Sequence, residues 1–225
     1  MDDARANRIA GWSGIAFSLL SLIVLPLAYP PPPALGATGG AFATYYREHR
    51  VGFLVGNYLG IAAFVPGFVQ LAILTSRIRR AEGAHGWFAT LVLATGTFTY
   101  AVFACSLVVF QVMPFLTDAT MHGEAHAMGT LGGVWFALDG LAALPLVTSV
   151  AWAGRETKVL PRWFVAFSVA ACLLAGAMSA GSLTTDPAAL RGAAALAGIG
   201  FLTFFVWTSV LSVLFLRGRV GAGGE

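Results

Sequence analysis

The sequence predicts an all-α membrane protein, a bundle of six transmembrane helices in a single domain spanning residues 1–225. Hydrophobic residues make up 58% of the chain and the mean hydropathy is +0.80, values typical of membrane proteins rather than soluble domains. Charged residues make up 10%, and almost all fall in short breaks between six apolar runs, each long enough to cross a bilayer as a helix. Only Asp139 lies well inside such a run.

Prolines and charged residues bound the first half of the predicted bundle. The first three predicted spans are 9–29, 51–75 and 87–112. Span one ends at four consecutive prolines, 30–33, through which no helix can continue. We expect a loop over 34–50 to follow. Span one is interpreted as part of the mature protein, although its flanks would also suit a cleaved signal peptide.

The second half of the chain follows the same pattern. The last three predicted spans are 131–153, 163–183 and 193–216. A loop over 114–130 is expected before span four. Pro66 in span two and Pro145 in span four each remove a backbone hydrogen bond, so each predicts a kink. Gly52, Gly56 and Gly60 recur every four residues and predict a ridge for close helix packing.

The basic residues predict the orientation of the bundle. With the N-terminus inside, ten Lys and Arg residues flank the spans on the cytoplasmic side, and only Arg47, Arg50 and Arg191 lie outside. Trp87 and Trp163 each open a span at the interface, a position that tryptophan prefers. Both termini are therefore predicted to be cytoplasmic. The bundle itself is predicted to lie in the plasma membrane.

Several classes of function are disfavoured by the sequence. The pI of about 9.2 could suggest nucleic acid, but the basic residues are dispersed among the breaks, so no nucleic-acid partner is expected. There is no P-loop, dinucleotide fingerprint or Cys-x-x-Cys motif. Cys105 and Cys172 lie at different predicted depths, which argues against a disulfide. The expected partners are the lipid bilayer and a small or lipidic ligand, and the sequence leaves the oligomeric state open.

Asp139 is the leading candidate for a functional residue. It lies about 12 Å from the outer end of span four, where a charge costs a few kcal/mol unless it is protonated, paired or hydrated. Other polar residues occupy the outer halves of the spans, and these complete the predicted ligand site: Asn57, Tyr100, Ser106, Gln111 and Ser179. We therefore predict a cavity open to the outer face, with Asp139 near its floor. The alternative is a neutral Asp139 that holds helices together by hydrogen bonds.

A second candidate site lies in the predicted loop over 114–130. His122 and His126 would share a helix face, and Asp118 and Glu124 add carboxylates, so the four could ligate a divalent metal. This is not the His-Glu-x-x-His pattern, and Gly123 weakens a helix there. The alternative is a solvated polar loop. No cofactor is predicted apart from this metal.

Two short segments resemble an uncharacterised bacterial membrane family, domain of unknown function 4386. Arg8-Ile9-Ala10-Gly11 resembles the start of that family, and Leu160-Pro161-Arg162-Trp163 is similar to its turn before span five. The resemblance implies a multi-pass bundle and no known activity, so it supplies no functional residues.

Three functions therefore stay open. The leading hypothesis is a non-enzymatic membrane protein that binds or moves a small or lipidic ligand at Asp139. The second is a membrane-embedded enzyme, with or without a metal, that uses His122, His126 and Asp118. The third is a structural or accessory subunit.

Overall fold

The computed structural model describes residues 2–28, 33, 37–179 and 187–221. Within these ranges the side chains of residues 28, 119, 136–137, 178–179, 187–198 and 201 are not described. The described chain is mostly helical and contains no strand, so the predicted all-α fold is confirmed for this part. The elements are α1 (Asp3–Ala28), α2 (Gly39–Glu48), α3 (Arg50–Glu82), α4 (Trp87–Val112), the 3₁₀ turns η1 (Met113–Phe115) and η2 (Ala119–Met121), α5 (His122–Ala142), α6 (Leu144–Thr157), α7 (Arg162–Ser179) and α8 (Pro187–Leu216).

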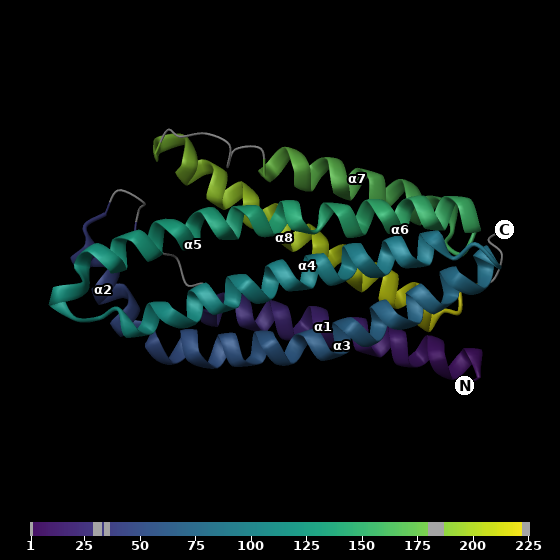
Figure 1. Cartoon of the computed structure of the whole chain (residues 1–225), viewed down its shortest axis with the longest axis horizontal. Helices are drawn as coiled ribbons and strands as arrows, with labels where there is room; N and C mark the ends of the chain where they lie inside the picture. Colours follow the sequence, from purple (N-terminus) through teal and green to yellow (C-terminus); the bar gives the residue numbers. More distant parts are fainter. Residues whose placement is uncertain (1, 29–32, 34–36, 180–186, 222–225) are drawn as a thin grey trace.

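The long helices lie side by side along one axis of the molecule (Figure 1). The start of α1 and the end of α8 lie at the same end, and α2 lies at the opposite end. Helix α1 packs against α3 and α8, and α7 packs against α6 and α8. Among the residues that the structure describes, four stretches are long and apolar enough to cross a membrane, judged by length and composition: Asp3–Leu27, Arg50–Glu82, Trp87–Phe115 and His122–Thr157. Two shorter apolar helical stretches, Arg162–Ala177 and Leu202–Leu216, accompany them.

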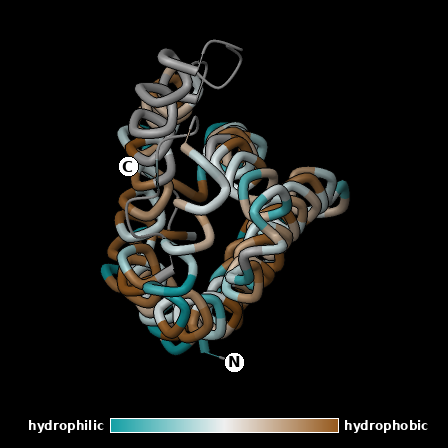
Figure 2. Tube along the Cα trace, turned by 90° about the vertical axis from the view of Figure 1, so that its left-hand side faces the viewer, coloured by the Kyte–Doolittle hydropathy of each residue, from teal (hydrophilic) through white to brown (hydrophobic). Residues whose placement is uncertain are grey.

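Apolar side chains cover the outside of the bundle as well as its interior. Figure 2 shows hydrophobic residues on the outward sides of the helices. Val51 is 73% exposed and Leu173 is 70% exposed, and many other large hydrophobic side chains share this surface. An apolar exterior of this extent is unfavourable in water, whereas hydrocarbon solvates it. The surface is therefore consistent with a membrane-embedded protein.

The predicted loop over 34–50 is wrong, because most of it forms α2. Thr38 caps this helix by accepting a hydrogen bond from the Ala41 amide at 3.3 Å. The buried side chains of Phe42 and Tyr46 then face α5. The sequence analysis missed α2 because its ten residues are too short and too polar for a span.

The predicted loop over 114–130 is also too long, because α5 begins at His122. The Tyr46 hydroxyl donates a 3.2 Å hydrogen bond to the carbonyl oxygen of Ala125, and the ring of Phe42 packs edge-on against that of His126. Burial raises the pKa of Tyr46 above its ordinary value, so the hydroxyl keeps its proton and stays a donor at neutral pH. These contacts with α2 hold the polar first turns of α5 in a helix.

The predicted fourth span, 131–153, is interrupted near its middle. Helix α5 ends at Ala142, and α6 begins at Leu144 with Pro145 in its first turn. The Thr99 hydroxyl of α4 donates a 2.8 Å hydrogen bond to the carbonyl oxygen of Ala142. A side chain of a neighbouring helix thus satisfies a backbone group that the break would otherwise leave free. Pro66, by contrast, lies within α3, which is assigned as one helix.

The predicted glycine ridge brings α3 close to its neighbours. A Cβ atom at Gly60 would lie 2.9 Å from Leu107 Cδ1 of α4, and one at Gly52 would lie 2.6 Å from the carbonyl oxygen of Leu27. Neither distance leaves room for a side chain without movement. The absence of side chains at these positions therefore allows α3 to pack tightly against α1 and α4.

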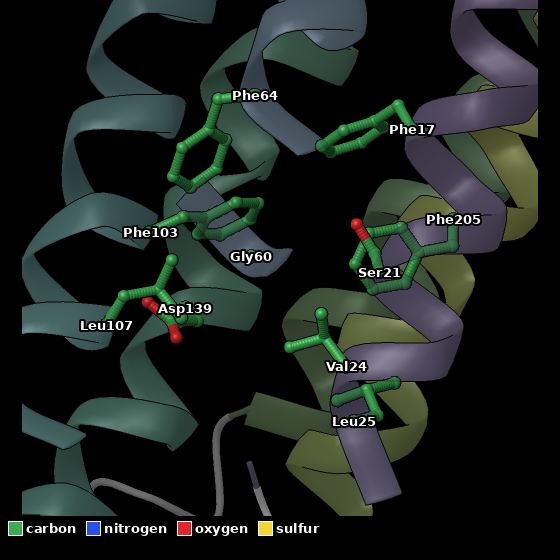
Figure 3. Close-up of a pocket in the computed structure, with 10 residues that line it drawn as sticks. All are labelled: Phe17, Ser21, Val24, Leu25, Gly60, Phe64, Phe103, Leu107, Asp139 and Phe205. Carbon is green, nitrogen blue, oxygen red and sulfur yellow. The ribbon is translucent and has the colours of Figure 1, made fainter. Parts of the chain in front are cut away.

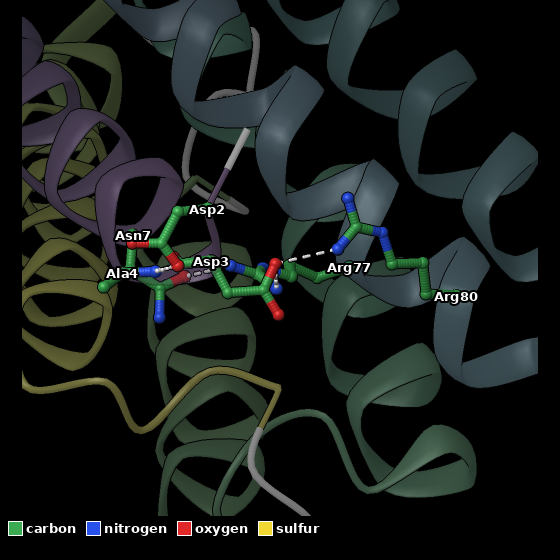
Figure 4. A network of polar contacts seen from close by, with 6 residues as sticks. All are labelled: Asp2, Asp3, Ala4, Asn7, Arg77 and Arg80. Atoms are coloured by element: carbon green, nitrogen blue, oxygen red, sulfur yellow. Dashed lines mark hydrogen bonds and ion pairs between the residues drawn. The ribbon is translucent and has the colours of Figure 1, made fainter.

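A polar network ties α1 to α3 at the end of the bundle that carries both termini (Figure 4). The Arg77 guanidinium forms a 2.7 Å ion pair with Asp3 and donates hydrogen bonds to the Asp3 carbonyl oxygen and to Asn7 Oδ1. Arg80 also pairs with Asp3, at 2.8 Å. Nearby, the Glu82 carboxylate accepts hydrogen bonds from the Phe88 and Ala89 amides and so caps α4.

Candidate functional site

Asp139 lies in the last turn of α5 and is only 2% exposed. Its Oδ1 accepts a 2.6 Å hydrogen bond from the Ser106 hydroxyl of α4. That distance lies at the short end of the range for a hydrogen bond between two oxygen atoms. The structure therefore brings together two of the residues that the sequence analysis assigned to one site.

Asp139 borders a cavity of about 40 Å³ between the helices (Figure 3). The lining comes from α1, α3, α4, α5 and α8, and consists of Phe17, Ser21, Val24, Leu25, Gly60, Phe64, Phe103, Leu107, Asp139 and Phe205. A bound water needs on the order of 10–15 Å³ of such space. The cavity therefore has room for a few waters or a small ligand, and not for a whole lipid.

The walls of this cavity are apolar apart from two side chains. Four phenylalanine rings contribute to the lining, and only Asp139 and Ser21 bring polar side-chain atoms to it. In Figure 3, Ser21 lies on α1 across the cavity from Asp139. A single carboxyl group among aromatic rings is an environment that suits a small cation, because the faces of the rings are electronegative.

Two further polar side chains near Asp139 have no hydrogen-bond partner among the described residues. Both amide atoms of Asn57 and the indole Nε1 of Trp135 are buried and unpaired. Trp135 lies one turn before Asp139 on the same face of α5, and Asn57 lies one turn before Gly60 on α3. Leaving such a group unsatisfied costs about 1–3 kcal/mol. Each of the two residues lies within one turn of a residue that lines the cavity, although neither lines it itself.

The remaining predicted ligand residues are placed differently. Tyr100 is buried, and its ring packs against those of Phe17, Phe64 and Phe68 at 4.8–5.8 Å between centroids. Tyr100 therefore packs against phenylalanine rings that line the cavity but does not line it itself. Gln111 is exposed near the end of α4. The side chain of Ser179 lies outside the described residues.

The predicted metal ligands lie where α2 meets α5. His126 Nδ1 is 3.0 Å from the carbonyl oxygen of Ala37, and Asp118 accepts a hydrogen bond from the Thr120 amide in η2. His122 and Glu124 are exposed. Within the part of the chain that the structure describes, no three His, Cys, Asp or Glu side chains are grouped so that they could hold a metal.

Sequence reasoning missed Ser21 and Trp135. Ser21 is one of several serines in apolar helices, and nothing in its local sequence separates it from the others. Trp135 lies four residues before Asp139, so its place on the same helix face was a signal that could have been used.

Comparison with known proteins found no relative of this chain. No family model, curated protein or solved structure matches it. The resemblance to domain of unknown function 4386 therefore stays a prediction, and the function has to be argued from the site itself.

Proposed function

We propose that the protein is a six-span membrane protein with both termini in the cytoplasm, and that it binds or translocates a small polar cation at Asp139. Two observations support the topology: both described ends of the chain lie at one end of the bundle, and the basic residues cluster on that side. By this proposal the protein lies in the plasma membrane.

The observation that carries the ligand proposal is the chemistry around Asp139. A buried carboxyl group faces an aromatic-lined cavity, and unpaired hydrogen-bonding atoms of Asn57 and Trp135 lie within one helical turn of its lining residues. A small ammonium ion or a hydrated inorganic cation would offset the charge of the Asp139 carboxylate and would lie among the phenylalanine rings of the lining. The volume of about 40 Å³ favours a small ligand over a lipidic one at this site.

The helix break beside Asp139 supports translocation rather than static binding. Interrupted helices line the substrate sites of many transporters, because their free backbone groups and their hinges serve both binding and movement. Here the break at Ala143 lies four residues after Asp139, and Thr99 bonds the carbonyl group on its near side. The interruption thus gives the carboxyl group a potential hinge within about one turn.

Ligand-dependent thermal stabilisation tests this proposal. The protein is placed in lipid nanodiscs and titrated with one chloride salt at a time, at constant ionic strength. The cations compared are sodium, potassium, ammonium, methylammonium and tetramethylammonium. We expect one of these cations to raise the Tm of the wild type and to have no such effect on Asp139→Asn. Asp118→Asn is the matched control, since Asp118 is exposed and distant in sequence. Equal responses of the wild type and Asp139→Asn would refute the proposal.

The enzyme and accessory-subunit hypotheses stay predictions of the sequence. The Ser106–Asp139 hydrogen bond between α4 and α5 is also a contact that a structural role of Asp139 would make. The metal content of the purified protein separates the metal-dependent form of the enzyme hypothesis from the others.

A further inference from the structure

A second and larger hollow lies on the side of the bundle, away from Asp139. It has a volume of about 500 Å³ and lies between α1, α7 and α8. Leu22, Leu202, Val206 and Val213 contribute to its almost wholly apolar lining, and each of these four side chains is at least 40% exposed. This lateral groove therefore opens toward the surroundings of the bundle rather than into its core.

The length of the lateral groove suits an extended hydrocarbon chain. Its lining runs from Leu202 in α8 to Arg217, which directly follows α8 and lies fifteen positions farther along the chain. At the rise of an α-helix this is roughly 22 Å. The hydrocarbon core of a bilayer is about 30 Å thick, so one leaflet contributes about 15 Å. The groove is thus long enough to hold a lipid acyl chain along its whole length.

One end of the lateral groove carries a cation and an aromatic residue. Arg217 and Trp163 both line it, and both are exposed. Arg217 forms no ion pair with any described residue. Arg and Trp are the residues that flank spans at the level of the lipid headgroups. The groove therefore presents an uncompensated positive charge where a lipid phosphate would lie.

We propose that the lateral groove is a binding site for an anionic phospholipid. One acyl chain lies along α8 against Val206 and Val213, the phosphate contacts the Arg217 guanidinium, and the Trp163 indole lies beside the glycerol region. This site is separate from the proposed cation site, although the ring of Phe205 lines both hollows. Its test therefore fails or succeeds independently of any cation bound at Asp139.

Native mass spectrometry of the detergent-purified protein measures this binding directly. The protein is titrated with dioleoyl phosphatidylglycerol and, separately, with dioleoyl phosphatidylcholine. We expect Arg217→Gln to weaken phosphatidylglycerol binding about five-fold, the ratio that corresponds to about 1 kcal/mol per basic residue at an anionic surface. The matched control is Arg79→Gln, an exposed arginine at the same end of the bundle that does not line the groove. We expect the control to bind like the wild type.

A second pair of variants tests the acyl-chain part of the site. Val206→Trp fills the lateral groove, whereas Val169→Trp adds the same bulk at an exposed position of α7 that does not line it. We expect only Val206→Trp to lose bound lipid. Circular dichroism and monodispersity confirm that both variants are folded.

Three outcomes would overturn the proposal. The first is equal affinity of the wild type for the two lipids. The second is equal weakening by Arg217→Gln and Arg79→Gln. The third is a lipid-free wild-type dimer that Val206→Trp converts to a monomer, because a second copy of the chain would then occupy the lateral groove.

Discussion

Ser106 and Asp139 are 33 residues apart in the chain, yet the Ser106 hydroxyl lies 2.6 Å from the Asp139 carboxyl oxygen in the interior of the bundle. The bond joins α4 to the last turn of α5. It gives the buried carboxyl group one partner, so the free side of that group faces the cavity. Several expectations about stability and binding depend on contacts of this kind.

The Ser106–Asp139 bond is expected to contribute modestly to stability. Hydrogen bonds between membrane helices average about 0.6 kcal/mol and reach about 1.7 kcal/mol in double-mutant cycles. We expect the cycle of Ser106→Ala and Asp139→Ala to give a coupling energy in this range, measured by unfolding in mixed micelles. The pair Ser209→Ala and Asp139→Ala is the control, because Ser209 lines the lateral groove instead. A coupling energy no larger than that of the control would show that the bond does not hold α4 to α5.

The helix break at Ala143 is expected to depend on Thr99. Thr99→Val keeps the shape of the side chain but removes the donor to the Ala142 carbonyl group. We expect a loss of about 0.6–1.7 kcal/mol and faster hydrogen exchange of the amides in the first turn of α6. Thr203→Val is the matched control, since Thr203 bonds only within its own helix. Unchanged exchange at α6 in Thr99→Val would contradict the assigned role.

Close packing of α3 predicts an order of severity among glycine substitutions. Gly52→Ala brings a methyl group to 2.6 Å from a backbone oxygen, whereas Gly60→Ala meets the flexible end of Leu107 at 2.9 Å. We expect Gly52→Ala to cost about 1–3 kcal/mol and Gly60→Ala to cost less. Gly123→Ala has open space in α5 and should stabilise the protein by about 0.4–1 kcal/mol. Thermal unfolding of the three variants checks the order, and a reversal of the first two would contradict the packing.

Arg77 and Arg80 both pair with Asp3, but they are expected to differ in importance. Arg77 is 8% exposed and also bonds Asn7 and a backbone carbonyl group, whereas Arg80 is 61% exposed. Arg77→Ala removes a buried guanidinium together with its ion pair and its two hydrogen bonds, so we expect it to cost about 1.5–3 kcal/mol. Arg80→Ala should cost much less, because water and salt screen an exposed pair. Chemical unfolding at low and high salt measures both losses. Similar losses in the two variants would contradict this reasoning.

The contact between His126 and Ala37 is expected to hold the start of α2 against α5. His126→Ala removes both the 3.0 Å contact with the Ala37 carbonyl oxygen and the packing on Phe42. We expect faster hydrogen exchange over residues 39–48, with His85→Ala, an exposed histidine between α3 and α4, as the control. Elemental analysis of His126→Ala and of His122→Ala tests the metal hypothesis. A stoichiometric metal that both variants lose would contradict a purely structural role for His126.

The helical fold was predictable from the sequence, and the short helices at the end of the bundle were not. Long apolar runs between charged breaks determine where helices form, since an unpaired backbone is too costly in hydrocarbon. Helix α2 lacks that signal. It forms because Phe42 and Tyr46 find a surface on α5, and this surface exists only once the chain has folded.

At Asp139, too, the sequence predicts one part of the candidate site and the folded structure decides the rest. A carboxyl group inside an apolar run is visible in the sequence and costly in a membrane, so Asp139 could be singled out as a candidate from its position alone. The sequence could not distinguish Ser106, which bonds Asp139, from Gln111, which is exposed, because both lie in the second half of one apolar run. Only the rotation and tilt of packed helices decide which polar side chains meet. The sequence therefore determined where the helices form and that one of them carries Asp139. The contacts between helices decided which side chain bonds Asp139 and which cavity it borders.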